Sequence, residues 1–124
     1  MLFKKPSLEE LLGQLTVAKS NYDAQSAILD TIEQNFESAR SCYYMYKHYY
    51  EAALAEYTRF GGKTYSEKEV EARHKYAIAS KNYISAENRL NNQTWVVRRA
   101  ERVYKKLKRL VTKKEEQNKN NQPQ

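Results

Sequence analysis

The chain has 124 residues, about the length of one domain, and its 22 Lys or Arg against 15 Asp or Glu give a formal net charge of +7. Three Gly, two Pro and a mean hydropathy of -0.95 argue against a turn-rich β-sandwich, a collagen-like fibre and a membrane-spanning protein. The single cysteine excludes an intramolecular disulfide and a multi-cysteine zinc site. Residues 1–6 hold no apolar run of signal-peptide length, so we expect a cytoplasmic, helical protein without a transmembrane segment.

The first predicted helix covers about residues 7–60 and follows a short tail of residues 1–6. Ser7 and Glu10 have the spacing of a capping box, in which each side chain accepts a hydrogen bond from the other residue's backbone N–H. From Leu8 onward, apolar or aromatic residues recur every seven positions, and a second such series follows three residues later. We call these series heptad positions a and d. Gln25 is the one polar member in this helix, and the pattern predicts one long coiled-coil helix.

Two adjacent glycines, Gly61 and Gly62, end this helix and open a predicted turn over residues 61–65. Glycine adopts the left-handed backbone conformation of a helix C-terminus without strain. Ser66 and Glu69 then repeat the capping-box spacing. They indicate the start of a second helix.

The second predicted helix covers about residues 66–116. Alanine fills four of its six d positions, and Gln93 is the polar exception. The hairpin therefore covers residues 7–116, and we expect the polar residues 117–124 to form a disordered tail.

The two seams fit together as an antiparallel hairpin when opposed residue numbers add up to 129. This register places large residues opposite small ones, as with Tyr50 and Ala79, which keeps the layer volume even. It also places Gln25 opposite Tyr104, whose hydroxyl is able to hydrogen-bond the amide. The same register predicts two ion pairs between the helices: Arg40 with Glu87, and Glu56 with Lys75.

Weak helix formers at residues 20–23 and 91–94 leave a second fold open, a bundle of three or four shorter helices. A break would shift the seven-residue phase, and no shift occurs. The fold class that we predict is therefore all-α, a long antiparallel two-helix coiled-coil hairpin that pairs into a four-helix bundle dimer.

Two apolar strips beside the seams predict self-association. They are Ile28, Val96, Val103 and Leu110 near the open end, and Leu54, Val70 and Ile84 near the turn. A hairpin of two helices leaves both strips in water, at a cost of about 25 cal/mol per Å² of apolar area. We therefore expect a homodimer, or a partner helix that covers them.

The region from residue 98 to residue 114 holds nine Lys or Arg and one acid, Glu101. Trp95, the only Trp of the chain, precedes it at an f position, directed away from the seam. We call Trp95 and the seven basic residues at positions b, c and f the basic face: Trp95, Arg98, Arg99, Arg102, Lys105, Lys106, Arg109 and Lys113. Such a face suits the phosphates of a nucleic acid or an acidic protein surface, and a Trp beside arginines suits base stacking or a protein contact.

Enzymatic constellations are scarce in the sequence. Glu71 and His74 have the Glu-x-x-His spacing of di-iron sites, but that chemistry needs a second such motif. His48 and His74 both fall at position f, on the solvent side. We interpret Cys42 as a partly buried structural thiol, because no His on its face is placed to act as a base. We therefore expect no catalytic, cofactor or metal site and no small-molecule substrate.

The sequence thus predicts a small, basic, non-enzymatic helical-hairpin binding protein, nucleic-acid-associated or regulatory, that uses the basic face. The alternative is a coiled-coil adaptor, chaperone or stalk protein of a secretion or assembly machine that binds an acidic protein partner. The outline resembles the stalk-like coiled-coil hairpins of flagellar and type III export systems, and also small plasmid RNA-binding hairpin dimers. This resemblance concerns the fold, and no residue is carried over from it.

Overall fold

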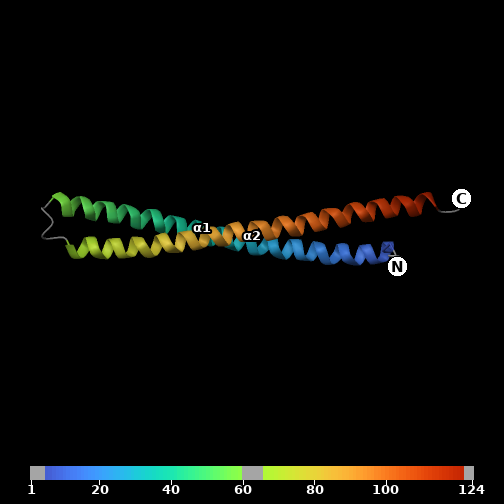
Figure 1. The fold of residues 1–124 in the computed structure, drawn as a ribbon, viewed down its shortest axis with the longest axis horizontal. Coiled ribbons are helices and arrows are strands. Elements are labelled where there is room, and N and C mark those ends of the chain that lie inside the picture. Colours follow the sequence, from blue (N-terminus) through green and yellow to red (C-terminus); the bar gives the residue numbers. More distant parts are fainter. Residues whose placement is uncertain (1–4, 60–65, 122–124) are drawn as a thin grey trace. The chain divides into compact units, whose positions relative to one another are not determined.

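The structure, a computed structural model, describes residues 5–59 and 66–121. Nearly all of them belong to two helices, α1, Leu8–Arg59, and α2, Ser66–Asn120 (Figure 1). The described residues contain no strand, and the chain is an all-α helical hairpin, as the sequence predicts.

Both helices are continuous, so the alternative bundle of shorter helices is wrong. Residues 20–23 lie inside α1, and residues 91–94 lie inside α2. A Ser or Asn costs only about 0.5 kcal/mol in a helix interior, which the packing of the seam on either side outweighs.

The start of α1 agrees with the predicted cap, and the start of α2 agrees with the predicted boundary. The backbone N–H of Glu10 donates a hydrogen bond to Ser7 Oγ at 3.1 Å, which caps α1. α2 begins at Ser66 and ends at Asn120, four residues further than the sequence predicts, so residues 117–120 are helical. The predicted turn with its two glycines lies outside the described residues, as do the parts of both tails over residues 1–4 and 122–124.

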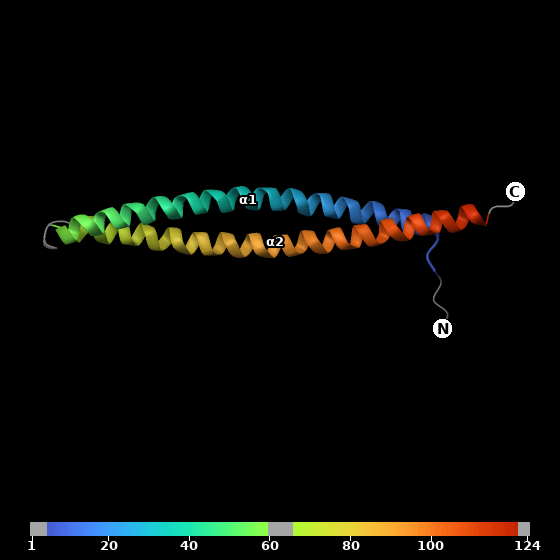
Figure 2. The ribbon, with the colours of Figure 1, turned by 90° about the horizontal axis from the view of Figure 1, so that it is seen from above.

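The hairpin divides into two compact units, each an antiparallel pair of helix segments (Figure 2). We call residues 5–29 with 93–121 the terminal unit, and residues 30–59 with 66–92 the middle unit.

The buried side of each unit is the predicted seam. Four side chains are buried in the terminal unit, Leu11, Ala18, Ala100 and Val111, and Ala79 is buried in the middle unit. All five occupy a or d positions. The other a and d side chains whose burial is described are partly buried, and most positions outside the seam are exposed. The heptad assignment is therefore confirmed.

The register in the terminal unit differs from the prediction, because the two polar seam residues contact each other. The side-chain amide of Gln93 donates to Gln25 Oε1 at 2.9 Å and to the Gln25 backbone carbonyl at 3.0 Å. Tyr104 instead stacks on Tyr22, with ring centroids 5.9 Å apart. The predicted pair of Gln25 with Tyr104 is wrong. That register would have left the Gln93 amide against the ring of Phe36, where it has no hydrogen-bond partner.

The middle unit shows the same displacement. The ring of Tyr43 lies between those of Tyr76 and Tyr83, at centroid distances of 5.6 and 4.9 Å. Tyr50 packs on Tyr76 at 5.5 Å. Tyr43, rather than Tyr50, therefore lies opposite Ala79, and opposed residue numbers add up to about 122, one heptad of seven residues less than predicted. A slip of one heptad keeps every a and d residue in the seam.

The predicted interhelical ion pairs fail for the same reason. Arg40 pairs with Glu37 at 3.9 Å and Lys75 pairs with Glu71 at 3.1 Å, each within its own helix. Both pairs are exposed, so they contribute little to the choice of register.

Replacing Leu11 by Ala tests the seam. Leu11 is 4% exposed, so we expect Leu11→Ala to lower the free energy of unfolding by about 2–4 kcal/mol through lost packing. The adjacent Leu12 is 43% exposed, and Leu12→Ala is expected to cost less than about 1 kcal/mol. Urea unfolding followed by circular dichroism measures both. Equal losses would contradict the assigned seam.

Replacing Gln93 by Ala tests the register. We expect Gln93→Ala to lower the free energy of unfolding by about 1 kcal/mol, because Gln25 loses the donor to its backbone and side-chain oxygens. Gln34→Ala, at an exposed f position of α1, is the control and is expected to stay within about 0.5 kcal/mol. In a Gln25→Ala background the effect of Gln93→Ala should shrink, and an undiminished effect would show that the contact is not formed.

Candidate functional site

Trp95 lies on α2 in the terminal unit, on the side of the helix opposite the seam. Its side chain is 59% exposed, as the f position predicts. Three residues later, the guanidinium carbon of Arg98 lies 5.6 Å from the centroid of the Trp95 ring, a cation–π contact. Because Arg stays charged at any physiological pH, this contact holds a fixed positive charge beside an accessible indole ring.

The remaining basic-face residues are exposed as well. Burial of Ala100 and Val111 against α1 fixes the rotation of α2, and so directs positions b, c and f to solvent. The structure therefore brings Trp95 and the seven predicted basic residues onto one side of one helix, over about 22 Å from Arg98 to Lys113 at 1.5 Å per residue.

One residue of the basic face is partly neutralised. Lys105 Nζ lies 2.6 Å from a carboxylate oxygen of Glu101, one helix turn earlier. The hydrogen bond to Glu101, and then its negative charge, raise the pKa of Lys105 above its ordinary value. Lys105 therefore stays charged at neutral pH, but its charge is offset locally. Five others form no ion pair among the described residues: Arg99, Arg102, Lys106, Arg109 and Lys113.

Sequence reasoning missed one contribution to the positive charge at the end of this face. Lys5, from the N-terminal tail, and Lys114 line a groove of about 320 Å³ in the terminal unit together with Lys113. Leu11 and Leu110 line the same groove. The position of Lys5 follows from the observed register. Opposed residue numbers add up to about 122, so residue 5 lies level with residue 117, close to Lys113 and Lys114.

The residues predicted for self-association are all exposed in the single chain. Their exposed fractions range from 39% to 60%. Ile28, Val96, Val103 and Leu110 lie in the terminal unit, and Leu54, Val70 and Ile84 lie in the middle unit. Their exposure agrees with the prediction, while the partner that covers them stays a prediction.

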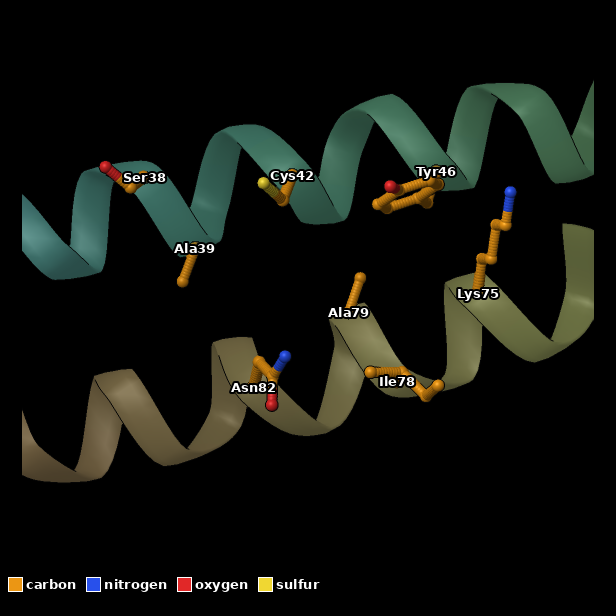
Figure 3. Close-up of a pocket in the computed structure, with 8 residues that line it drawn as sticks. All are labelled: Ser38, Ala39, Cys42, Tyr46, Lys75, Ile78, Ala79 and Asn82. Atoms are coloured by element: carbon orange, nitrogen blue, oxygen red, sulfur yellow. The ribbon is translucent and has the colours of Figure 1, made fainter.

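The interpretation of Cys42 needs correction, because its thiol is free and exposed. Cys42 lines a groove of about 470 Å³ in the middle unit (Figure 3), where Ala39 and Ala79 project between the two helices. A sum of 129 would have placed the long side chain of Arg89 beside this thiol. The observed register, shorter by seven residues, places the shorter Asn82 there instead (Figure 3).

The tyrosines of the middle unit form packing contacts in the seam. The hydroxyls of Tyr43 and Tyr76 lie 3.4 Å apart, and this hydrogen bond raises the pKa of Tyr43 above its ordinary value of 10. The raised pKa keeps the Tyr43 hydroxyl protonated at neutral pH, so Tyr43 and Tyr76 share a neutral hydrogen bond.

Other classes of site receive no support from the described part of the chain. His48 and His74 are exposed. Among the residues that the structure describes, no group of three or more His, Cys, Asp or Glu is placed to hold a metal ion. Neither described helix has a stretch long and apolar enough to cross a membrane. Comparison of the chain with protein-family models, with curated proteins and with solved structures gives no match.

The positive field around Trp95 is testable by fluorescence quenching. We expect the ratio of iodide to caesium quenching of Trp95 at low salt to exceed the ratio for free tryptophan amide at least about twofold, because Arg98 and its neighbours attract anions. Arg98→Ala should lower this ratio, whereas Arg73→Ala, on α2 in the middle unit, should leave it unchanged. A ratio no higher than that of free tryptophan amide would contradict the described electrostatics.

Proposed function

We propose that this protein is a non-enzymatic, basic helical-hairpin binding protein that binds single-stranded nucleic acid through the basic face. The observation that carries the proposal is the exposed Trp95 ring with the Arg98 guanidinium against it, at the start of a line of exposed, mostly unpaired basic residues. A reducing cytoplasm is part of the proposal, because the exposed Cys42 thiol stays reduced there.

Trp95 favours a single strand over a duplex. An indole ring stacks on a base only when that base is unstacked from its neighbours, and each such contact contributes about 1–3 kcal/mol. The flanking residues are Arg and Lys, which bind phosphates through charge. Stacking and charge both tolerate any base, so we expect binding with little sequence preference.

The basic face also fits the backbone of a strand in extent. Positively charged side chains recur at each turn of α2 from Arg98 to Lys113, and Glu101 is the single acid in that segment. Each phosphate that a Lys or Arg neutralises releases counterions, so affinity falls steeply as salt concentration rises.

Binding of a fluorescently labelled single-stranded 20-mer tests the proposal. We expect the logarithm of the association constant to fall with the logarithm of salt concentration at a slope steeper than about -2, which corresponds to three or more phosphate contacts. Trp95→Ala should weaken binding by about tenfold or more, because stacking is lost. Tyr49→Ala, which removes an equally exposed aromatic ring from α1, is the matched control and should have no effect.

A salt-independent affinity, or equal effects of the two substitutions, would overturn the proposal. A pull-down carried out with and without nuclease distinguishes the proposed nucleic-acid binding from the alternative, an acidic protein partner. Loss of the captured material on nuclease treatment supports the nucleic acid, and capture that resists nuclease but requires Trp95 supports the protein partner.

A further inference from the structure

Between Glu10 at position c and Glu56 at position g, α1 carries its charged residues on one flank of the helix. They are eight residues, from Lys19 to Glu51, and all of them occupy heptad positions b and e. The twelve g and c positions of the same stretch, on the opposite flank, hold no Lys, Arg, Asp or Glu. In a chain that is 30% charged, about four charges are expected at twelve solvent-facing positions.

Apolar side chains gather on the uncharged flank. In the terminal unit this flank carries Val17 and Ile28 of α1 beside Val96, Val103 and Leu110 of α2, all between 40% and 70% exposed. In the middle unit it carries the groove at Cys42, to which α2 contributes the exposed Ile78 and also Lys75, whose charge is paired with Glu71.

The other flank of the terminal unit has the composition of a solvated surface. Lys19 and Asp23 of α1 occupy its e and b positions, and α2 contributes the ion pair of Glu101 with Lys105. The uncharged flank thus exposes five large aliphatic side chains in the terminal unit, against Leu12 alone on the other flank, and its charges there lie at Glu10 and at the c positions of α2. The uncharged flank is therefore the one suited to burial.

The area that the chain exposes is large enough for such a contact. The accessible surface is 10165 Å², compared with about 6,900 Å² for a compact monomer of 14.7 kDa. No large side chain of the described residues is fully buried. A stable protein interface needs about 800 Å² from each partner, which is a small part of the surface that the chain exposes.

We infer that a second copy of this chain covers the uncharged flank and forms a four-helix bundle. The flank is complementary to itself, as a two-fold interface requires, because it combines large side chains on one helix with smaller ones on the other. On α2 it presents projecting aliphatic side chains, Val96, Val103 and Leu110. On α1 it presents mostly smaller residues such as Asn21 and Ala24.

The charges of α2 select which helices face each other. Arg99, Lys106 and Lys113 occupy c positions at the border of the flank, and all three are exposed. Two copies that pack α2 against α2 bring these like charges together. A two-fold axis parallel to the helices packs α2 of each copy against α1 of the other, where the facing surface is uncharged. This arrangement leaves Trp95 and the f-position arginines in water.

The oligomeric state tests the inference, which does not rest on the proposed function. We expect sedimentation equilibrium to give twice the chain mass for the unmodified protein at 100 µM. Val17→Lys and Ala24→Lys place a positive charge on the flank, against the basic c positions of the other copy's α2, and should raise the dissociation constant of the dimer by about thirtyfold or more. Thr16→Lys, one residue away at position b, is the matched control and should change it less than threefold. All three positions are exposed in the single chain, and circular dichroism verifies that each variant is folded.

Cys42 gives a second readout, because it is the single cysteine and lies on the same flank. Its reaction with an aromatic disulfide reagent should slow at least about tenfold as the protein dimerises, and Val17→Lys should restore the fast rate at the same concentration. A monomer at 100 µM, equal effects of Val17→Lys and Thr16→Lys, or a concentration-independent thiol rate would each overturn the inference. The dimer should persist at 1 M salt, where the proposed nucleic-acid binding is lost. Measurements at high and low salt therefore test the dimer and the nucleic-acid binding independently.

Discussion

Packing of small side chains against tyrosine rings along the seam determines which side of each helix faces water. In the middle unit, Ala79 leaves room for the ring of Tyr43, which settles between Tyr76 and Tyr83. In the terminal unit, Ala18 and Ala100 are buried to a similar degree. The direction of every outward side chain, Trp95 included, follows from this rotational setting, because a helix that buries one stripe exposes the opposite one.

The rotational setting is readable from the sequence, whereas the longitudinal register is not readable from periodicity alone. A slip of seven residues leaves each a and d position in the seam, so the burial of Leu11 or Val111 is the same for sums of 122 and 129. The two registers differ in whether the side chains of Gln25 and Gln93 have hydrogen-bond partners. Matching the two polar seam residues to each other would have given the observed register, since an unpaired amide in the seam costs more than an imperfect match of volumes.

The difference between rotational setting and longitudinal register also explains which site predictions agree with the structure. Exposure of Trp95 and of the basic residues depends on heptad phase alone, and the structure agrees with it. The environment of Cys42 depends on which α2 residues lie across from it, so the register error carried over into its predicted burial. Contacts within one helix, such as Arg98 on Trp95, require the side-chain conformations as well, which a heptad pattern does not contain.

Charge is distributed differently on the two helices, and this difference connects the two proposals. From residue 98 to residue 114, α2 concentrates positive charge on positions b, c and f, whereas the eight charges of α1 between Glu10 and Glu56 all occupy b and e. The c positions of α2 therefore border both the proposed nucleic-acid surface and the proposed dimer interface. A basic residue at that border would repel a second α2 and tolerate an uncharged α1, so under the two proposals the charges that favour phosphate binding would also set the order of helices in the bundle. The two proposals thus assign one stripe of residues to affinity on one side and to specificity of assembly on the other.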